Sequence, residues 1–220
     1  FLHFQDRSAY GRVVHLQPMR WENDWPMIGI HQNASGCGEP VAIHRKPDVG
    51  MVYPAAAPQA SDRFDGRLPG LQWQWQAQPQ PSWYSLSARP GWLRLNAQAL
   101  PAGGSLFASP AMALQKFPAP DFGMTAMMDA AGLRAGESGG VIVFGRDYSS
   151  VAVRRAVRGW SVVRSTCIGA DHGAGEMVST IASVKHARVW LRVDVQSAAD
   201  SAGVLRALCT FSFSTDGTSY

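Results

Sequence analysis

The densest group of polar side chains in this sequence lies near its N-terminus. It combines imidazole, guanidinium, amide and carboxylate groups: His3, Gln5, Asp6, Arg7, Arg12, His15, Glu22 and Asp24. His3 and Gln5 stand two positions apart, so they share one face of an expected strand, and Arg12 begins the returning strand. Arginine offers a rigid fork of donors, so this set could line a carbohydrate or anion pocket. Ordinary polar turns are the alternative that the spacing leaves open.

Two opposed carboxyl groups, one acting as acid and the other as base or nucleophile, are needed to hydrolyse a glycosidic bond. Asp6 together with Glu22 or Asp24 is the pair that this segment could offer. Glu22 and Asp24 lie in a turn-rich stretch, however, which favours a solvated loop. The sequence has no Ser-His-Asp, Cys-His or phosphate-loop pattern, and His172 and His186 are expected at the surface. The residue pattern alone therefore assigns no catalytic group.

Aromatic side chains offer a second kind of contact, because a flat ring can stack on the apolar face of a sugar. Trp92 and Trp190 alternate with apolar neighbours and therefore fall on the polar faces of their expected strands. They are the candidate sugar-stacking residues. Trp73 and Trp75 instead share a face with Leu71, and this pattern predicts that they belong to the core.

Composition excludes several classes of protein. Of the 220 residues, 46% are hydrophobic and 16% are charged, which excludes a disordered chain or a coiled coil. The net charge of +4 comes from dispersed arginines, and without a basic stripe we expect no nucleic-acid partner. No apolar run approaches the roughly 18 residues of a membrane span, so we expect a soluble chain without a membrane partner. Cys37, Cys167 and Cys209 lack metal-ligand spacing and are expected to be buried or idle thiols.

Alternation of apolar and polar residues dominates the chain beyond residue 60 and predicts strands. It is present in residues 71–78, 93–97, 122–128, 189–195 and 209–213. Residues 141–144 and 150–153 are short apolar runs typical of buried strands, separated by a turn at 145–147. The 22 glycines and 14 prolines leave little room for long helices. We therefore expect an all-β fold, an antiparallel sandwich or jelly roll.

The N-terminal part has a different organisation. Residues 2–5 and 13–17 predict a hairpin around Gly11, within an expected unit of two to four strands that reaches residue 45. Residues 46–60 are rich in proline and alanine and predict a linker, and the sandwich is expected from residue 61. The chain opens on a strand-like run without methionine and closes on a strand and a turn. These features predict a piece of a larger protein.

Five segments carry a resemblance to glycoside hydrolase family 43. Residues 3–19 (HFQDRSAYGRVVHLQPM) and 23–29 (NDWPMIG) are similar to the closing part of that family's propeller domain. Residues 70–75 (GLQWQW), 91–95 (GWLRL) and 145–148 (GRDY) resemble the sandwich appended to its β-xylosidase and α-L-arabinofuranosidase members. The similarity runs along nearly the whole chain, and the ordered combination of segments is specific.

The resemblance implies a five-bladed β-propeller that holds the active site, followed by a concanavalin-like β-sandwich. It implies that residues 1–45 are the last propeller blade, 46–60 a linker, and 61–220 the sandwich, incomplete at its C-terminus. The family hydrolyses xylosidic and arabinofuranosidic bonds with inversion, using an Asp base, a second Asp and a Glu acid in earlier blades. None of these carboxylates matches a residue here, so we expect a glycosidase as the parent and an inactive chain.

The same resemblance implies roles for two residues of the N-terminal segment. Arg12 matches the substrate-site arginine, and His3 matches a histidine that faces a calcium ion at the propeller axis through water. His3 and Gln5, which share one face of the expected strand, join Arg12 as the expected substrate-binding residues. The expected partner is a xylo-oligosaccharide or arabinoxylan, and the expected location is secreted or periplasmic in a bacterium, with the cytoplasm as alternative. A non-catalytic carbohydrate-binding module and a purely structural β domain are the other functions left open.

Overall fold

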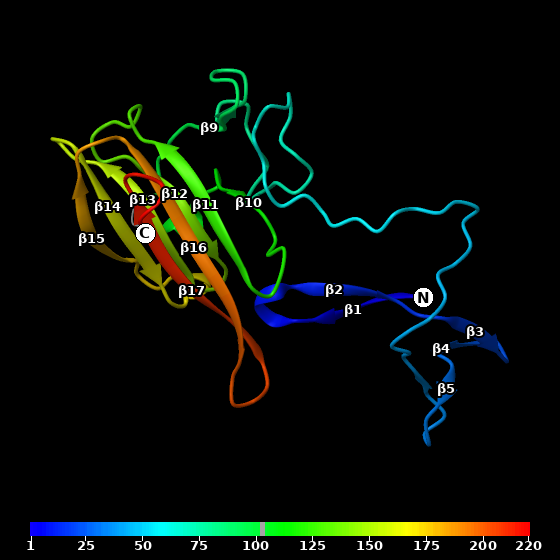
Figure 1. Cartoon of the computed structure of the whole chain (residues 1–220). Coiled ribbons are helices and arrows are strands. Elements are labelled where there is room, and N and C mark those ends of the chain that lie inside the picture. The colour runs from blue at the N-terminus through cyan, green and yellow to red at the C-terminus, as the bar shows by residue number, and fades with distance from the viewer. Residues whose placement is uncertain (102–103) are drawn as a thin grey trace. The chain divides into compact units, whose positions relative to one another are not determined.

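The computed structural model describes residues 1–101 and 104–220, and their regular structure is almost entirely β (Figure 1). The helices among these residues are three-residue 3-10 turns, η1 (Ser8–Tyr10), η2 (Leu106–Ala108) and η3 (Ala170–His172). None of the described helices is long and apolar enough to cross a membrane. The expected all-β fold is therefore confirmed. The chain divides into two compact units, residues 1–57 with 199–206 and residues 58–198 with 207–220.

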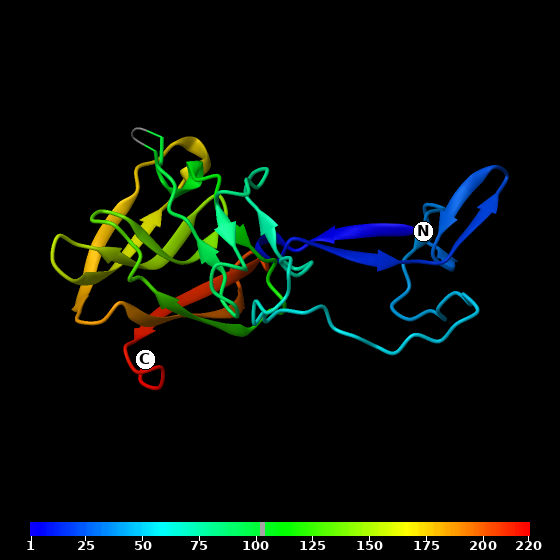
Figure 2. The ribbon, with the colours of Figure 1, turned by 90° about the horizontal axis from the view of Figure 1, so that it is seen from above.

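The second unit contains a sandwich of two sheets, seen as two layers in Figure 2. One sheet has the strand order β11-β16-β17, and the other has the order β12-β13-β14-β15. Their strands are β11 (Phe122–Asp129), β12 (Ser138–Phe144), β13 (Tyr148–Arg155), β14 (Trp160–Cys167), β15 (Met177–Val184), β16 (Arg188–Ala199) and β17 (Leu205–Ser214). β12 to β15 are antiparallel to their neighbours, as β11 is to β16. The expected antiparallel sandwich is present.

Strand β16 supplies a buried row of side chains to the core of the sandwich. The row consists of Val189, Leu191, Val193 and Val195, each at most 4% exposed. Val189 and Leu191 form one cluster with valines of the four-stranded sheet, Val141, Val151, Val153, Val162 and Val184. Complete burial of one such side chain contributes about 1.5–3 kcal/mol, so this row is a major stabilising element. The strand predicted from the alternation in residues 189–195 is confirmed.

Strand β13 of the four-stranded sheet is buried on both faces. Val151 and Val153 of β13 belong to the sandwich core, whereas Tyr148 (3% exposed) and Ser150 (4% exposed) lie on the other face. The second face is covered by a smaller cluster of Tyr148, Cys167, Ala170, Leu106, Phe107, Ile142, Phe144 and Ala174. A strand buried on both faces reads as an apolar run rather than as an alternation. The buried strand expected at residues 150–153 is confirmed.

Two sandwich strands have only a weak signal in the sequence. β14 and β15 interrupt their valines and isoleucine with polar residues, among them Arg164 and Ser179. The two strands pair from Trp160↔Val184 to Thr166↔Met177, with a register shift at Val162/Val163. The stability of a strand depends on its cross-strand partners more than on its own residues, so local alternation did not reveal this pair.

The segment before the sandwich strands carries only two-residue strands. They are β7 (Gln74–Trp75), β8 (Tyr84–Ser85), β9 (Arg94–Leu95) and β10 (Ala113–Leu114), paired as β7–β10 and β8–β9. The prediction that Trp73 and Trp75 belong to the core is wrong, because both are only half-buried and lie outside the two core clusters. Leu71, which shares their expected face, is 103% exposed. Asp62 accepts hydrogen bonds from Trp73 Nε1 at 2.8 Å and from Gln72 Nε2 at 3.2 Å. Polar bonds to Asp62 thus hold this region as a loop, where a long strand was expected.

Three hairpins lie within residues 1–57 of the first unit. They are β1 (Leu2–Asp6) with β2 (Arg12–Leu16), β3 (Met19–Glu22) with β4 (Trp25–Ile28), and β5 (His31–Gln32) with β6 (Gly38–Glu39). Six strands replace the two to four expected, because Asn33 closes a turn that composition does not reveal. Its side chain accepts hydrogen bonds from the amides of Ser35 and Cys37 at 2.9 and 3.1 Å. The described residues 40–73, which follow β6, contain no strand or helix.

Tyr148 provides a test of the cluster on the second face of the four-stranded sheet. Its hydroxyl donates to Glu176 and accepts from the Leu106 amide at 3.1 Å. Tyr148→Phe removes both bonds at a buried site, so we expect urea titration to show a loss of about 1–3 kcal/mol in unfolding free energy. The matched control Tyr53→Phe, at a residue that is 66% exposed, should change it by less than about 0.5 kcal/mol. Unchanged stability of Tyr148→Phe would contradict this role.

The same variant also tests the pH dependence of stability. Burial and the bond to Glu176 raise the pKa of Tyr148 from 10.0 to about 12. A phenol with a raised pKa in the folded state contributes stability below the unfolded pKa, and this contribution is lost as pH rises through the folded value. The stability difference between wild type and Tyr148→Phe should therefore shrink between pH 10 and about 12. A difference that stays constant over this interval would contradict the assignment.

Candidate functional site

The β1–β2 hairpin carries the three residues predicted to bind substrate. His3 lies opposite His15 in the antiparallel register, and Arg12 lies opposite Asp6. Alternation along β1 places His3 and Gln5 on one face of the hairpin and Asp6, with its partner Arg12, on the other. The hairpin thus brings His3 and Gln5 together and separates both from Arg12.

Arg12 lies among exposed groups at the turn of this hairpin. Its guanidinium carbon stands 4.8 Å from the centre of the Phe4 ring, and its Nε lies 4.0 Å from Asp6 Oδ2. The Arg12 and Asp6 side chains are each 68% exposed, and such a pair contributes only about 0–1 kcal/mol. The guanidinium can therefore turn to another acceptor at little cost. Its role in substrate binding stays a prediction.

His3 is held by stacking rather than by hydrogen bonds. Its ring stacks on His15 at 5.2 Å and on Phe1 at 5.9 Å between ring centres. Its Nε2 atom is buried and has no hydrogen-bond partner in the part of the chain that the structure describes. Calcium prefers six to eight oxygen ligands, and the described residues contain no group of three His, Cys, Asp or Glu side chains that could hold a metal ion. The described residues alone therefore do not assemble a calcium site. The calcium ion at the propeller axis of the parent, which His3 would face through water, stays a prediction, and we assign it no step.

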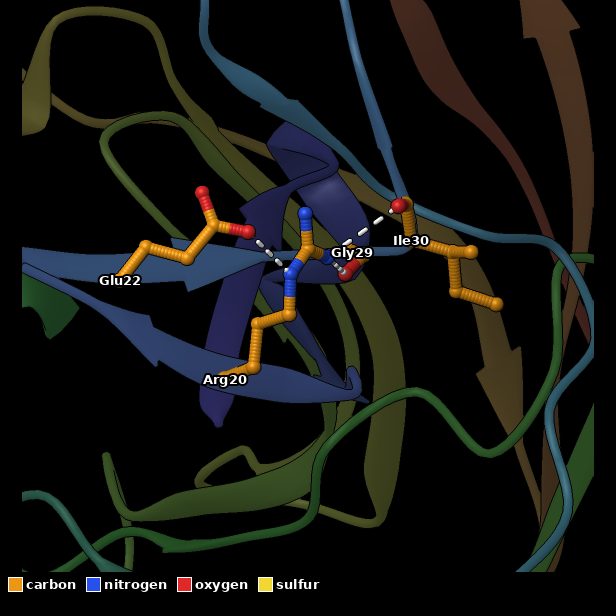
Figure 3. A network of polar contacts seen from close by, with 4 residues as sticks. All are labelled: Arg20, Glu22, Gly29 and Ile30. Carbon is orange, nitrogen blue, oxygen red and sulfur yellow. Dashed lines mark hydrogen bonds and ion pairs between the residues drawn. The ribbon is translucent and has the colours of Figure 1, made fainter.

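Two of the three carboxylates considered for a catalytic pair, Asp6 and Glu22, have structural partners. Figure 3 shows Glu22 accepting a hydrogen bond from Arg20 Nε at 2.6 Å. Arg20 Nη1 also donates to the carbonyl oxygens of Gly29 and Ile30, at 3.4 and 3.2 Å, and so connects β3 to the residues that follow β4. Asp6 Oδ1 accepts from the Ser8 amide at 2.8 Å. Glu22 and Asp6 therefore stabilise local turns, and neither has the environment of a general acid.

The two candidate stacking residues, Trp92 and Trp190, lie near a single carboxylate in the second unit. The Arg89 guanidinium carbon stands 3.8 Å from the centre of the Trp92 ring, and its Nη1 donates to Asp129 Oδ2 at 2.9 Å. Trp190 is half-buried and lines an open cavity of about 410 Å³ together with Asp129. The other lining residues are His186, Ala187, Arg188 and Thr215. Arginine already occupies one side of Trp92, whereas Trp190 faces a cavity.

Asp129 is the functional candidate that sequence reasoning missed. The hydrogen bond from Arg89 and that from the Ala131 amide hold its pKa below the usual value, against the opposing effect of burial. The carboxyl group is therefore ionised at neutral pH. The sequence did place this residue at the end of the alternation in residues 122–128. Its contact with Arg89, which is 40 residues away, is a tertiary feature that the local pattern does not reveal.

His172, His186 and the three cysteines belong to no metal-binding group within the described part of the chain. His172 and His186 are exposed, as predicted. The three cysteines are free, with Cys167 buried, Cys209 half-buried and Cys37 exposed. Burial raises the pKa of the Cys209 thiol, which lowers its reactivity.

Comparison with known proteins gives the class of this chain. Residues 61–220 match the family model of the β-xylosidase C-terminal concanavalin A-like domain. The chain belongs to this domain family of glycoside hydrolase family 43.

Individual relatives agree with this assignment. The chain is 47% identical over 97 residues to "Putative beta-xylosidase" of Xylanibacter ruminicola, covering 44% of this chain and 18% of that protein. It is 44% identical over 92 residues to a β-xylosidase of Formosa agariphila, covering 42% of this chain and 15% of that protein. A structure titled as a bifunctional GH43-CE protein of Bacteroides eggerthii superposes with a TM-score of 0.70 at 25% identity, covering 99% of this chain and 26% of that one. The chain thus matches less than a fifth of the length of these curated relatives.

Proposed function

We propose that this chain is part of a glycosidase that hydrolyses xylosidic or arabinofuranosidic bonds of hemicellulose with inversion. The observation that carries the proposal is the match of residues 61–220 to the C-terminal domain of β-xylosidases. The two curated relatives named as β-xylosidases, of which the chain covers 18% and 15%, support the same substrate class. In this proposal, residues 1–45 form the last blade of the propeller that holds the active site.

The exposed apolar face of the β1–β2 hairpin supports its assignment to a propeller blade. Leu2, Phe4, Val14 and Leu16 share this face through the pairs Leu2↔Leu16 and Phe4↔Val14. They are 69%, 56%, 68% and 53% exposed. A hairpin stabilised by so little burial needs a further surface to cover its apolar side chains. Neighbouring blades would supply that surface, with Arg12 at one end of it.

The acid and the base of the reaction would come from residues outside this chain. Glu22 is paired with Arg20 at 2.6 Å, and Asp6 lies 4.0 Å from Arg12. Neither carboxylate lines either of the two best-defined cavities among the described residues, so neither faces a second carboxyl group across a cavity there. This chain would contribute substrate-binding groups and a supporting domain, while the earlier blades would carry the proton transfers.

Activity of the chain by itself is the first test. General acid and base catalysis each contribute roughly 10²–10⁴-fold, so a chain without them should show no turnover of aryl xylosides or aryl arabinofuranosides. Release of nitrophenol from both substrates measures this directly. Turnover that follows the purified chain and disappears in Asp6→Asn or Glu22→Gln would overturn the proposal.

Arg12 provides the second test, in the full-length parent. If its guanidinium binds a sugar hydroxyl, Arg12→Ala should lower kcat/KM by at least about 100-fold, which corresponds to ~3 kcal/mol for a lost charged hydrogen bond. Arg12→Lys should not restore activity, because lysine lacks the planar fork of donors. The melting temperature should barely move, since both side chains of the Arg12–Asp6 pair are 68% exposed.

Arg7→Ala is the matched control for this experiment, because Arg7 is an exposed arginine at the same turn. Its kcat/KM should stay within a few-fold of the wild-type value. If Arg12→Ala behaves like Arg7→Ala, or if its loss of activity is matched by unfolding, Arg12 has no role in the substrate site.

A further inference from the structure

The outer face of the three-stranded sheet carries a row of side chains around Trp190. Trp190 stands between Val189 and Leu191, which are both 0% exposed, so its ring faces away from the sandwich core. The register places Trp190 opposite Met127 and Arg188 opposite Asp129. Alternation along both strands therefore puts an indole, a guanidinium and a carboxylate on one face, around the cavity described above.

Asp129 is fixed in place and still able to accept hydrogen bonds. Its Oδ2 accepts from Arg89 Nη1 at 2.9 Å, and its Oδ1 accepts from the Ala131 amide at 3.2 Å. An ionised carboxylate has about four acceptor positions, so two bonds leave room for ligand hydroxyls. The Arg89 guanidinium is itself held flat against Trp92. This arrangement orients the carboxylate before any ligand arrives.

Arg188 offers donors beside this carboxylate. Its Nη2 lies 4.0 Å from Asp129 Oδ2, which is beyond hydrogen-bond distance, and its side chain is 51% exposed. A guanidinium and a carboxylate this close together can bind two adjacent hydroxyl groups of one ligand. The guanidinium donates a hydrogen bond to one hydroxyl, and the carboxylate accepts a hydrogen bond from the other. Two guanidinium groups, those of Arg89 and Arg188, stand beside the one carboxylate of Asp129, so the net charge of these three side chains is positive.

The residues after β17 hold the Trp190 ring. Gly217 lies so close to the indole that a Cβ atom on it would stand 2.9 Å from Cε2, and its φ of +81° favours glycine. Asp216 fixes this turn by accepting from the amides of Thr218 and Ser219 at 2.8 and 2.9 Å. A ring that is already immobilised loses little rotamer entropy when a ligand binds to it.

We infer that this cavity is an accessory saccharide site, in which a pyranose ring packs on Trp190 and its hydroxyls bond to Asp129 and Arg188. A pyranose has an apolar C–H face and a polar hydroxyl edge, which match the indole and the charged pair. The volume of about 410 Å³ falls within the range of about 300–1,000 Å³ of small-ligand sites. Only the choice of hemicellulose as ligand rests on the proposed function, because the site contains neither His3, Gln5 nor Arg12.

The test uses the ¹⁵N-labelled 220-residue chain titrated with xylohexaose and, separately, with a glucuronic acid-substituted xylo-oligosaccharide. The reporter is the indole Nε1–H resonance of Trp190, assigned from its disappearance in Trp190→Phe. We expect a saturable shift of this resonance with a Kd of about 1 mM, which is the affinity of one or two ring contacts. Tighter binding of the acidic oligosaccharide would place its carboxylate on Arg188.

Three variants make the test specific, with affinity measured by calorimetry. Trp190→Ala should weaken binding at least about tenfold, and Arg188→Ala at least about threefold. Arg146→Ala is the matched control, because Arg146 is 90% exposed and does not line the cavity; its affinity should equal that of the wild type. Circular dichroism melting checks folding, and if Trp190→Ala is unfolded, Trp190→Phe and Arg188→Ala decide the outcome.

The inference is overturned if neither oligosaccharide shifts the Trp190 resonance at about 10 mM, tenfold above the expected Kd. It is equally overturned if binding is unchanged in Trp190→Ala and Arg188→Ala. Its failure is distinguishable from failure of the proposed function, because the Arg12 experiment measures hydrolysis by the parent and this one measures binding to the chain alone.

Discussion

Burial of the inner row of β16 is the constraint on which the sandwich depends. Val189 and Leu191 join the valines of the four-stranded sheet in one core cluster. Because side chains alternate along a strand, this burial also decides which residues of β16 reach the surface. A slip of one residue would bury Trp190, Arg192 and Asp194 instead. Arg192 and Asp194 bond to each other at 2.6 and 2.7 Å on the outside, where ionised groups remain hydrated.

The same constraint connects the core to the proposed saccharide site. With the β16 register fixed, Arg188 must lie beside Asp129 at the end of β11. Arg89, in the loop between β8 and β9, donates a hydrogen bond to Asp129. Its guanidinium also stacks on Trp92 and so places that ring near the same carboxylate. The first unit lacks a comparable core, because Met27 is the single buried hydrophobic residue among its described side chains. Its hairpins depend on backbone pairing and on local bonds such as the Arg20 network.

The sequence predicted the strands that are buried on one face, through alternation, and the strand that is buried on both faces, through an apolar run. The alternation in residues 122–128, 189–195 and 209–213 became β11, β16 and β17. The alternation that begins at Leu71 did not predict the structure correctly. Asp62 accepts hydrogen bonds from the neighbouring Trp73 and Gln72, and these bonds hold the segment as a loop. Alternation assumes a sheet partner, and this segment has one for two residues only.

The candidate site was less predictable, because its geometry comes from pairing and tertiary contacts. The sequence indicated His3, Gln5 and Arg12 as one group, and only the register of β1 and β2 separates Arg12 from the other two. The outward position of Trp190 could be predicted from its alternation with apolar neighbours, whereas its role in sugar binding stays a prediction. Asp129 was not, since its partners Arg89 and Arg188 come from other parts of the chain.

Native-state hydrogen exchange tests most directly whether the β16 row anchors the fold. Amides of the central part of β16 should exchange only through global unfolding, with an opening free energy equal to that from urea titration of the same unit. Amides of the β1–β2 hairpin should exchange with a much lower opening free energy. If the amides of Val189 to Val195 exchange as fast as those of the hairpin, β16 is not the anchor, and the account of the core and its outer face is wrong.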